Sequence, residues 1–157
     1  MSTLSVLERS AALGVVAGMR SMAAPAALSR HLATDPTVPQ GVVDDLLSRP
    51  HAPLVLGIVS AAEHVADKLP FIPARTDPAP LAGRIAAGAL CGYVIARRAG
   101  ESAAMGAVVG GLAAAAATFA FYYLRRSLTS DAGLPDLAVA LAEDVAAVGI
   151  AEFALKQ

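Results

Sequence analysis

The stretch SAAEHVADKLPFIPARTDPAPLAGR, residues 60–84, decides the expected fold. An apolar segment enters this stretch and ends in four ionisable residues, Glu63, His64, Asp67 and Lys68. Prolines at positions 70, 73, 78 and 80 then interrupt the chain, and a second apolar segment leaves it. Ionisable groups beside a proline-rich connection are unusual in a soluble helical bundle, but they fit two membrane-crossing helices joined by a turn.

The composition favours lipid as the surroundings of most of the chain. Of its 157 residues 56% are hydrophobic and 16% are charged, and the mean hydropathy is +0.59. A soluble domain usually carries about 25% charged residues. The net charge of −1 gives no basic surface for nucleic acid, so the expected partner is the lipid bilayer.

Five apolar segments predict an all-α membrane protein with about five transmembrane helices in a single domain. The expected spans are residues 4–32, 52–69, 80–97, 102–124 and 134–155. The fourth has no charge over its 23 residues, which at 1.5 Å per residue exceeds the apolar thickness of a bilayer. The first should be kinked or broken near Arg20 and Pro25, because an interior proline removes a helix hydrogen bond.

The polar residues 33–51 predict a loop or a short amphipathic helix at the membrane interface. Elsewhere, pairs of glycines four residues apart predict close helix packing, since helices associate in lipid through small residues that let backbones approach. These pairs are Gly14 and Gly18, Gly88 and Gly92, and Gly106 and Gly110. Such packing also favours a homodimer. A soluble alanine-rich bundle is the alternative interpretation.

The first two segments resemble the last two, which predicts an internal repeat. Each pair has a glycine-paired helix with arginine, a connection containing proline, and an acid-bearing helix. One intervening span would make the two units antiparallel, as in small transporters with inverted repeats. Chance similarity of alanine-rich helices is the alternative. Five spans would put six basic residues on one side and five on the other, so orientation is not predicted and an antiparallel dimer is a hypothesis.

Three motifs resemble those of a known family. They are AGMRSMAAPAAL at 17–28, EHVADKLPFIPARTDPAPLAGR at 63–84 and LPDLAVALAED at 134–144. They resemble the bacterial membrane family catalogued as domain of unknown function 4126, with an AGxR helix, an ExxADKxP hinge, RTxP, and a late acidic helix. The resemblance covers most of the chain. It implies a multi-pass protein of the bacterial inner membrane and implies no activity.

Ionisable residues at bilayer depth cost about 2.5–3.5 kcal/mol each, so they mark candidate functional positions. The primary candidates are Arg20, Glu63, Glu143 and Asp144. Glu63 and Glu143 should face each other across a polar cavity, with Arg20 as a counter-charge or as a site for an anion. This arrangement predicts a small transporter or channel for an ion or small polar solute, with proton coupling as one form. The alternative is a non-transporting assembly or scaffold protein, in which the charges only lock helices together.

Secondary candidates lie around the proline-rich connection and near the end of the fourth segment. They are His64, Asp67, Arg75, Arg84 and Arg126. Arg84 is expected to reach outward to the interface. His64 points about 100° away from Glu63 on a helix, so a metal site is not expected. We find no nucleophile–base pair, phosphate loop or dinucleotide motif, and therefore expect neither an enzyme nor a cofactor.

Overall fold

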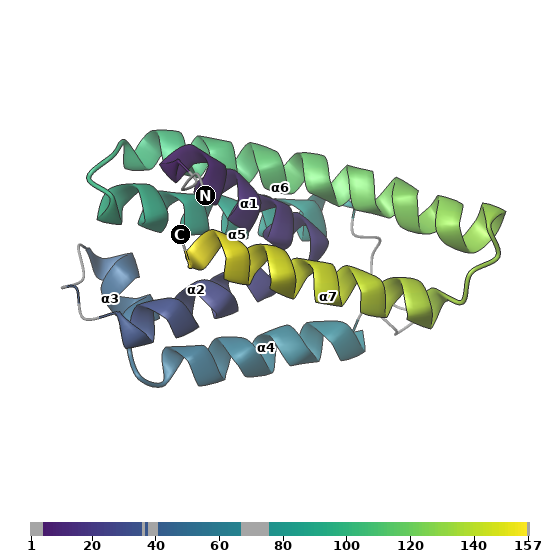
Figure 1. Ribbon diagram of the computed structural model, residues 1–157, viewed down its shortest axis with the longest axis horizontal. Coiled ribbons are helices and arrows are strands. Elements are labelled where there is room, and N and C mark those ends of the chain that lie inside the picture. The colour runs from purple at the N-terminus through teal and green to yellow at the C-terminus, as the bar shows by residue number, and fades with distance from the viewer. Residues whose placement is uncertain (1–4, 36, 38–40, 67–75, 157) are drawn as a thin grey trace.

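The computed structural model describes residues 5–35, 37, 41–66 and 76–156, and every regular element in them is helical. The predicted all-α class is confirmed. The elements are α1 Val6–Met19, α2 Ala23–Thr34, α3 Val42–Ser48, α4 Ala52–Ala66, α5 Pro78–Arg98, α6 Ala103–Arg126, a π-helical turn Ser127–Asp131, and α7 Asp136–Leu155. In Figure 1 the chain termini lie near each other.

The first predicted span is two helices that form a hairpin. Arg9 Nε, on α1, donates to the Ala154 carbonyl over 3.0 Å, and Arg30 Nη2, on α2, lies 4.0 Å from Glu152 Oε1. Both helices therefore adjoin the last turns of α7, whereas Arg20 between them meets Asp144 in the middle of α7. The expectation of one span over residues 4–32 is wrong, because the second helix returns toward the end from which the first began (Figure 1).

The break between these helices lies at residues 20–22. Arg20 has φ −142° and ψ 113°, an extended conformation that ends α1. Pro25 is the third residue of α2. At that position its missing N–H costs nothing, since the first N–H groups of a helix have no intrahelical partner. The proline therefore fits the start of a new helix instead of kinking an old one.

Three helices form the core of the molecule: α1, α5 and α6. A Cβ atom on Gly14 would overlap the carbonyl oxygen of Gly110, and one on Gly92 would overlap that of Gly106. Gly88 likewise faces Gly110, and Gly18 faces Ala114. These glycines let the backbones approach more closely than any larger residue would allow.

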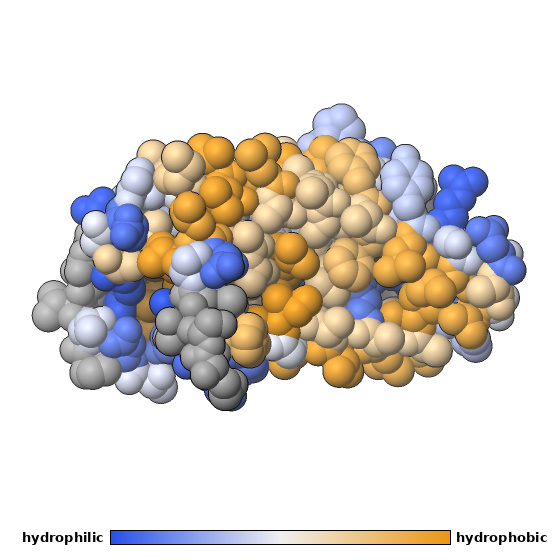
Figure 2. Space-filling model, turned by 45° about the horizontal axis from the view of Figure 1, so that its top comes forward, coloured by the Kyte–Doolittle hydropathy of each residue, from blue (hydrophilic) through white to orange (hydrophobic). Residues whose placement is uncertain are grey.

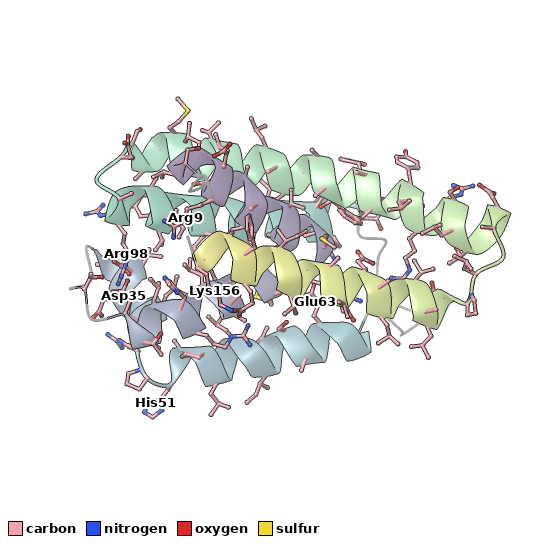
Figure 3. The ribbon with its side chains drawn as sticks, in the orientation of Figure 1. Arg9, Asp35, His51, Glu63, Arg98 and Lys156 are labelled. Atoms are coloured by element: carbon pink, nitrogen blue, oxygen red, sulfur yellow. The ribbon has the colours of Figure 1, made fainter. Side chains whose placement is uncertain are left out.

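The end of the molecule with both termini also holds α3 and the turn between α5 and α6; we call it the termini end (Figure 1). There Arg98 Nε donates to both carboxylate oxygens of Asp44 over 2.9 Å, and its Nη1 donates to Asp35 over 2.8 Å (Figure 3). The Ser29 hydroxyl donates to the Leu47 carbonyl over 2.6 Å. These contacts attach α3 to α2 and α5.

Large apolar side chains cover much of the outside of the molecule. Exposed examples are Leu54, Val55, Ile58 and Val59 on α4, Met105, Val108, Leu112 and Phe119 on α6, and Leu141, Val145, Val148 and Phe153 on α7. Figure 2 shows a broad apolar band between polar ends. Two described helical stretches, Pro78–Arg98 and Ala103–Asp131, are long and apolar enough to cross a membrane.

The other predicted spans do not meet that test within the described residues. The apolar part of α4 is short, and α7 carries four acidic residues. The predicted repeat also takes a different form. Because the hairpin returns the chain to the termini end, α6, the first helix of the second unit, starts at the same end as α1, the first helix of the first unit (Figure 1). The predicted entry of the two units from opposite sides is therefore not found.

Candidate functional site

The tip of the α1–α2 hairpin is closed by Glu63 from α4. The backbone N–H and the hydroxyl of Ser21 donate to Glu63 Oε1 over 3.0 and 2.5 Å, and the Met22 N–H donates to Oε2 over 3.0 Å. These groups precede the first turn of α2, where N–H groups lack helical partners and the helix dipole is positive. A carboxylate therefore suits this position, and Glu63 caps α2.

Arg84 from α5 caps the other side of the break. Its Nη1 donates to the carbonyls of Gly18 and Met19 over 3.1 and 3.0 Å, at the end of α1 where the dipole is negative. Arg84 Nη2 lies 3.5 Å from Glu63 Oε1. We call Glu63, Arg84 and the backbone at 18–22 the hairpin clamp. Arg84 is 3% exposed, so the expectation that it reaches outward is wrong.

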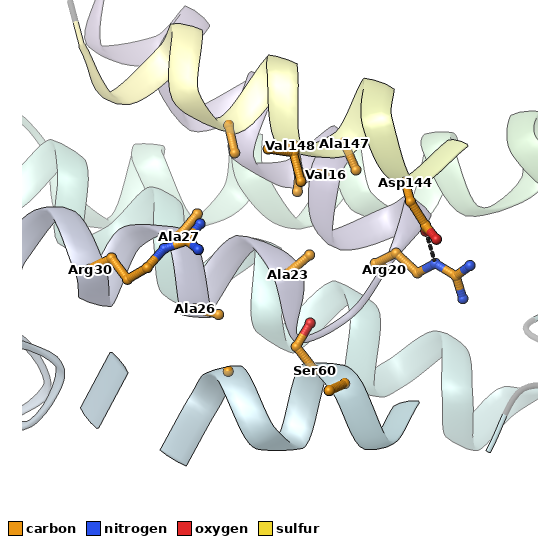
Figure 4. Close-up of a pocket in the computed structure, with 13 residues that line it drawn as sticks. Val16, Arg20, Ala23, Ala26, Ala27, Arg30, Ser60, Asp144, Ala147 and Val148 are labelled. Atoms are coloured by element: carbon orange, nitrogen blue, oxygen red, sulfur yellow. Dashed lines mark hydrogen bonds and ion pairs between the residues drawn. The ribbon is translucent and has the colours of Figure 1, made fainter. Parts of the chain in front are cut away.

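Arg20 and Asp144 form a separate ion pair, with Arg20 Nε 2.8 Å from Asp144 Oδ1. The pair lines a cavity of about 270 Å³, which we call the lateral cavity. Its walls come from α1, α2, α4 and α7: Val16, Arg20, Ala23, Ala26, Ala27, Arg30, Gly57, Ser60, Ala61, Asp144, Ala147, Val148 and Ala151. Figure 4 shows Ser60 of α4 on the side of the cavity opposite α7. Most of the wall is small and apolar, with its charges toward the two ends.

Glu143 lies on another face of α7 and takes no part in the lateral cavity. Its Oε2 is 3.7 Å from Arg125 Nη1, and Arg125 also donates to both oxygens of Asp136 over 2.9 and 2.7 Å. Both Glu143 and Arg125 line an apolar cavity of about 310 Å³ between α6 and α7. Glu63 and Glu143 therefore do not face each other across one cavity, and the Arg20 ion pair is with Asp144, not with either glutamate.

The remaining predicted site residues are outside this arrangement or outside the described part of the chain. Asp67, Arg75 and the side chain of His64 lie outside the described residues. Arg126 is exposed, next to the π-helical turn. Among the described side chains, no group of three or more His, Cys, Asp or Glu residues is arranged to hold a metal ion.

Sequence analysis missed two residues of this region. Ser21 supplies two of the donors to Glu63, and Arg30 lines the lateral cavity near the termini end. Ser21 precedes the N-cap residue Met22, and its hydroxyl donates to Glu63 instead of accepting from a helix N–H, so the usual N-cap signal does not mark it. Arg30 has no local signal either, because its place depends on the return direction of α2.

These features define a small all-helical protein built around a helical hairpin whose tip is closed by opposite charges, with two helices of membrane-crossing length and apolarity. The chain belongs to the family described as Domain of unknown function (DUF4126), whose sequence model matches residues 8–157. The predicted family is thereby confirmed. A comparison with curated proteins and one with solved structures each gave no match.

Proposed function

We propose that the chain is a multi-pass protein of the bacterial inner membrane, crossed by α4, α5, α6 and α7, with α1 and α2 as a re-entrant hairpin. The apolar outer faces of α4, α6 and α7 support this proposal, since a soluble protein rarely exposes a large contiguous apolar surface. The acids in the middle of α7 line cavities between helices and have basic partners there, and charges within a bilayer are tolerated where they face such cavities and pair with one another. The hairpin clamp supplies partners to backbone groups that lipid could not.

The hairpin also changes the expected orientation. It brings Arg9 to the same end as the other basic residues near the termini. That end then holds six, namely Arg9, Arg30, Arg49, Arg97, Arg98 and Lys156. The opposite end holds Arg125 and Arg126 among the described residues. Basic residues favour the cytoplasmic side, so we place both termini in the cytoplasm.

One orientation for all copies argues against the antiparallel homodimer, and a homodimer of parallel copies stays a prediction. Reporter fusions at Gln157 test the orientation. A cytoplasmic C-terminus gives fluorescence from a fused green fluorescent protein and no activity from a fused alkaline phosphatase. The reverse result would contradict the assignment.

We further propose that the protein is a transporter or channel for an ion or small polar solute, and that the solute binds in the lateral cavity. The observation that carries this is the ion pair of Arg20 and Asp144 on the wall of a cavity of about 270 Å³ beside a helix break. At roughly 30 Å³ for each water molecule, that volume suits several waters or one small solute. Discontinuous helices around a polar site are typical of small transporters.

The hairpin clamp favours a second candidate, a membrane assembly or scaffold protein. Glu63 makes four contacts with three residues, Ser21, Met22 and Arg84, and each contact fits a structural role. Buried ion pairs can fix the arrangement of helices without chemistry. The two candidates differ in whether the lateral cavity conducts anything.

Two glycines give a matched test. A Cβ atom on Gly57 or on Gly149 would meet nothing within 4 Å, so both positions accept a side chain without a clash. Gly57 lines the lateral cavity, whereas Gly149 does not. Gly57→Leu should therefore fill the cavity, and Gly149→Leu should leave it open.

The measurement is osmotic swelling of proteoliposomes in potassium chloride, potassium formate, glycerol and urea. We expect the wild type to accelerate swelling for at least one solute. Gly57→Leu and Asp144→Asn should each reduce that rate at least tenfold, and Gly149→Leu should not. A pH gradient across the same vesicles tests proton coupling. No acceleration by the wild type, or equal rates for both glycine variants, would favour the scaffold candidate.

A further inference from the structure

Helix α4 is the least buried of the long helices. None of its described side chains, residues 52–63, is buried. It packs against α2 and α3, and several of its large apolar residues face outward, such as Leu54 at 66% exposure and Ile58 at 61%. By contrast, α5 and α6 carry rows of fully buried small residues. Moving α4 would therefore disrupt little packing.

A charged residue near the far end of this helix joins it to the hairpin tip and to α5. Glu63 is the one charged residue among 52–63, and it reaches from α4 to the hairpin tip and to α5 (Figure 3). Its side chain is 14% exposed and accepts three hydrogen bonds besides its ion pair with Arg84. Charge-assisted hydrogen bonds of this kind are stronger than neutral ones.

The same helix forms one wall of the lateral cavity. Gly57, Ser60 and Ala61 lie on the wall from α4, and Ala147 and Val148 lie on the wall from α7 (Figure 4). Between α4 and α7 there is little direct packing, because the helices that α4 contacts closely are α2 and α3. A displacement of α4 away from α7 would therefore widen the cavity along its length.

We propose that α4 is the gate of the lateral cavity and that Glu63 is the latch that holds it closed. This inference rests on the proposed transport function and adds a moving part to it. In the closed state the carboxylate of Glu63 caps α2 and fixes α4 at one point near its far end. In the open state the carboxylate leaves Ser21, Met22 and Arg84, while Arg84 still caps α1. Glu63 is thus a positioning residue, not a residue that contacts the solute.

Distances between spin labels test the latch directly. Labels at Ile58→Cys on α4 and Val145→Cys on α7 occupy exposed positions, and Cys91→Ala removes the buried native thiol. Pulsed electron paramagnetic resonance on the protein in nanodiscs should give one narrow distance with Glu63 intact. Glu63→Gln loses the ion pair but keeps an acceptor, so a second, longer distance should appear. Glu63→Ala should shift most of the population to that longer distance.

Two controls separate gate movement from unfolding. A label pair at Val108→Cys on α6 and Val145→Cys on α7 should keep its distance in every Glu63 variant. Glu101→Gln, at an exposed acid between α5 and α6, should leave the α4 distance unchanged. If the distance distribution of the control pair also broadens in Glu63→Ala, that variant has lost its fold, and the α4 distance in the milder variant Glu63→Gln tests the latch.

The distance measurement needs no solute, so it separates the two proposals. Unchanged α4 distances in Glu63→Gln, with the control pair intact, would overturn the latch whether or not the wild type transports. A longer α4 distance together with no swelling for any solute would support the latch and contradict the transport function. A reducible bifunctional thiol cross-linker between Gly57→Cys and Val148→Cys connects the movement to transport: cross-linking should lower solute flux at least fivefold, and a reductant should restore it. Unchanged flux after complete cross-linking would show that α4 is not the gate.

Discussion

The two helices on either side of the proline-rich connection are both rich in apolar residues, but they differ in where they lie and in how they pack. α5 lies in the core, with Gly88, Cys91 and Gly92 buried against α1 and α6. α4 lies at the edge, with Leu54 and Ile58 facing outward and no buried residue among its described side chains. The difference follows from the size of the side chains and from their spacing along each helix. Small residues four apart allow backbones to meet, whereas large branched residues on several faces favour lipid.

Glu63 on α4 and Arg84 on α5 form the ion pair that joins these helices. Because α5 lies in the core, loss of Arg84 should destabilise the protein more than loss of Glu63. Arg84→Leu leaves Glu63 and the α1 carbonyls buried without their cation, and breaking a buried pair in this way costs about 3–5 kcal/mol. We expect Arg84→Leu to abolish a monodisperse peak in size-exclusion chromatography in mild detergent. Arg126→Leu, at an exposed arginine on α6, is the matched control and should run as the wild type. Equal behaviour of the two variants would contradict the role of the clamp.

The core glycines of α5 should tolerate no side chain. Gly92→Val places its Cβ against the Gly106 carbonyl, and overpacking of a close contact costs about 3 kcal/mol or more. Thermal unfolding in detergent should show a loss of at least several degrees in Tm. Gly57→Val on α4 meets open space, so its Tm should change far less. A comparable loss at both positions would mean that helix propensity, not packing, dominates.

Where the space around a glycine is open, alanine should stabilise. Gly83→Ala near the start of α5 and Gly149→Ala on α7 meet nothing within 4 Å and should gain up to about 1 kcal/mol from lower backbone entropy in the unfolded chain. Gly88→Ala, five residues further along α5, should lose stability because its Cβ would overlap the carbonyl oxygen of Gly110. The measurement is again the shift of Tm, which we expect to be positive for Gly83→Ala and negative for Gly88→Ala, although both lie on α5.

The smallest effect concerns the attachment of α3, the neighbour of α4 at the termini end. The Thr37 N–H donates to Asp35 Oδ1 over 2.9 Å, and this bond, with a weaker contribution from Arg98, holds the pKa of Asp35 below its ordinary value. A lowered pKa gives stability that is present above the ordinary value and lost as the pH falls through the lowered one. The protection of the α3 amides from exchange, relative to their intrinsic rates at each pH, should therefore fall in acid below about pH 4. Asp35→Asn should already exchange faster at neutral pH, and it should lose the acid dependence.

Much of the helical organisation could be predicted from the sequence, because apolar runs, prolines and polar gaps mark where helices begin and end. The break near Arg20 and the short helix within residues 33–51 both have local signals. The direction of the chain after the break has none. The hydropathy of residues 23–34 is the same whether that helix continues forward or turns back. This one ambiguity produced the wrong first span and the wrong relation between the two repeat units.

The candidate site was harder to predict for the same reason. Glu63, Arg84, Arg20 and Asp144 were all identified as charges in apolar surroundings. Their pairing was not, because it depends on which helices surround the hairpin tip. Arg84 lies only one turn and a half into its helix, so a position at the interface was the simpler expectation. Contact with Gly18 and Met19 requires the hairpin to end beside α5, which no local pattern encodes.

The clamp has a consequence for biosynthesis. Arg84 follows Met19, whose carbonyl it binds, by 65 positions in the chain. The ribosome therefore completes both halves of the hairpin well before it makes the residues that satisfy the turn between them. The segment synthesised first must wait, sheltered by the insertion machinery or lying at the membrane surface, until the third apolar segment emerges. Nascent chains arrested before position 84 should leave this hairpin accessible to water-soluble probes, and those arrested after position 126 should protect it.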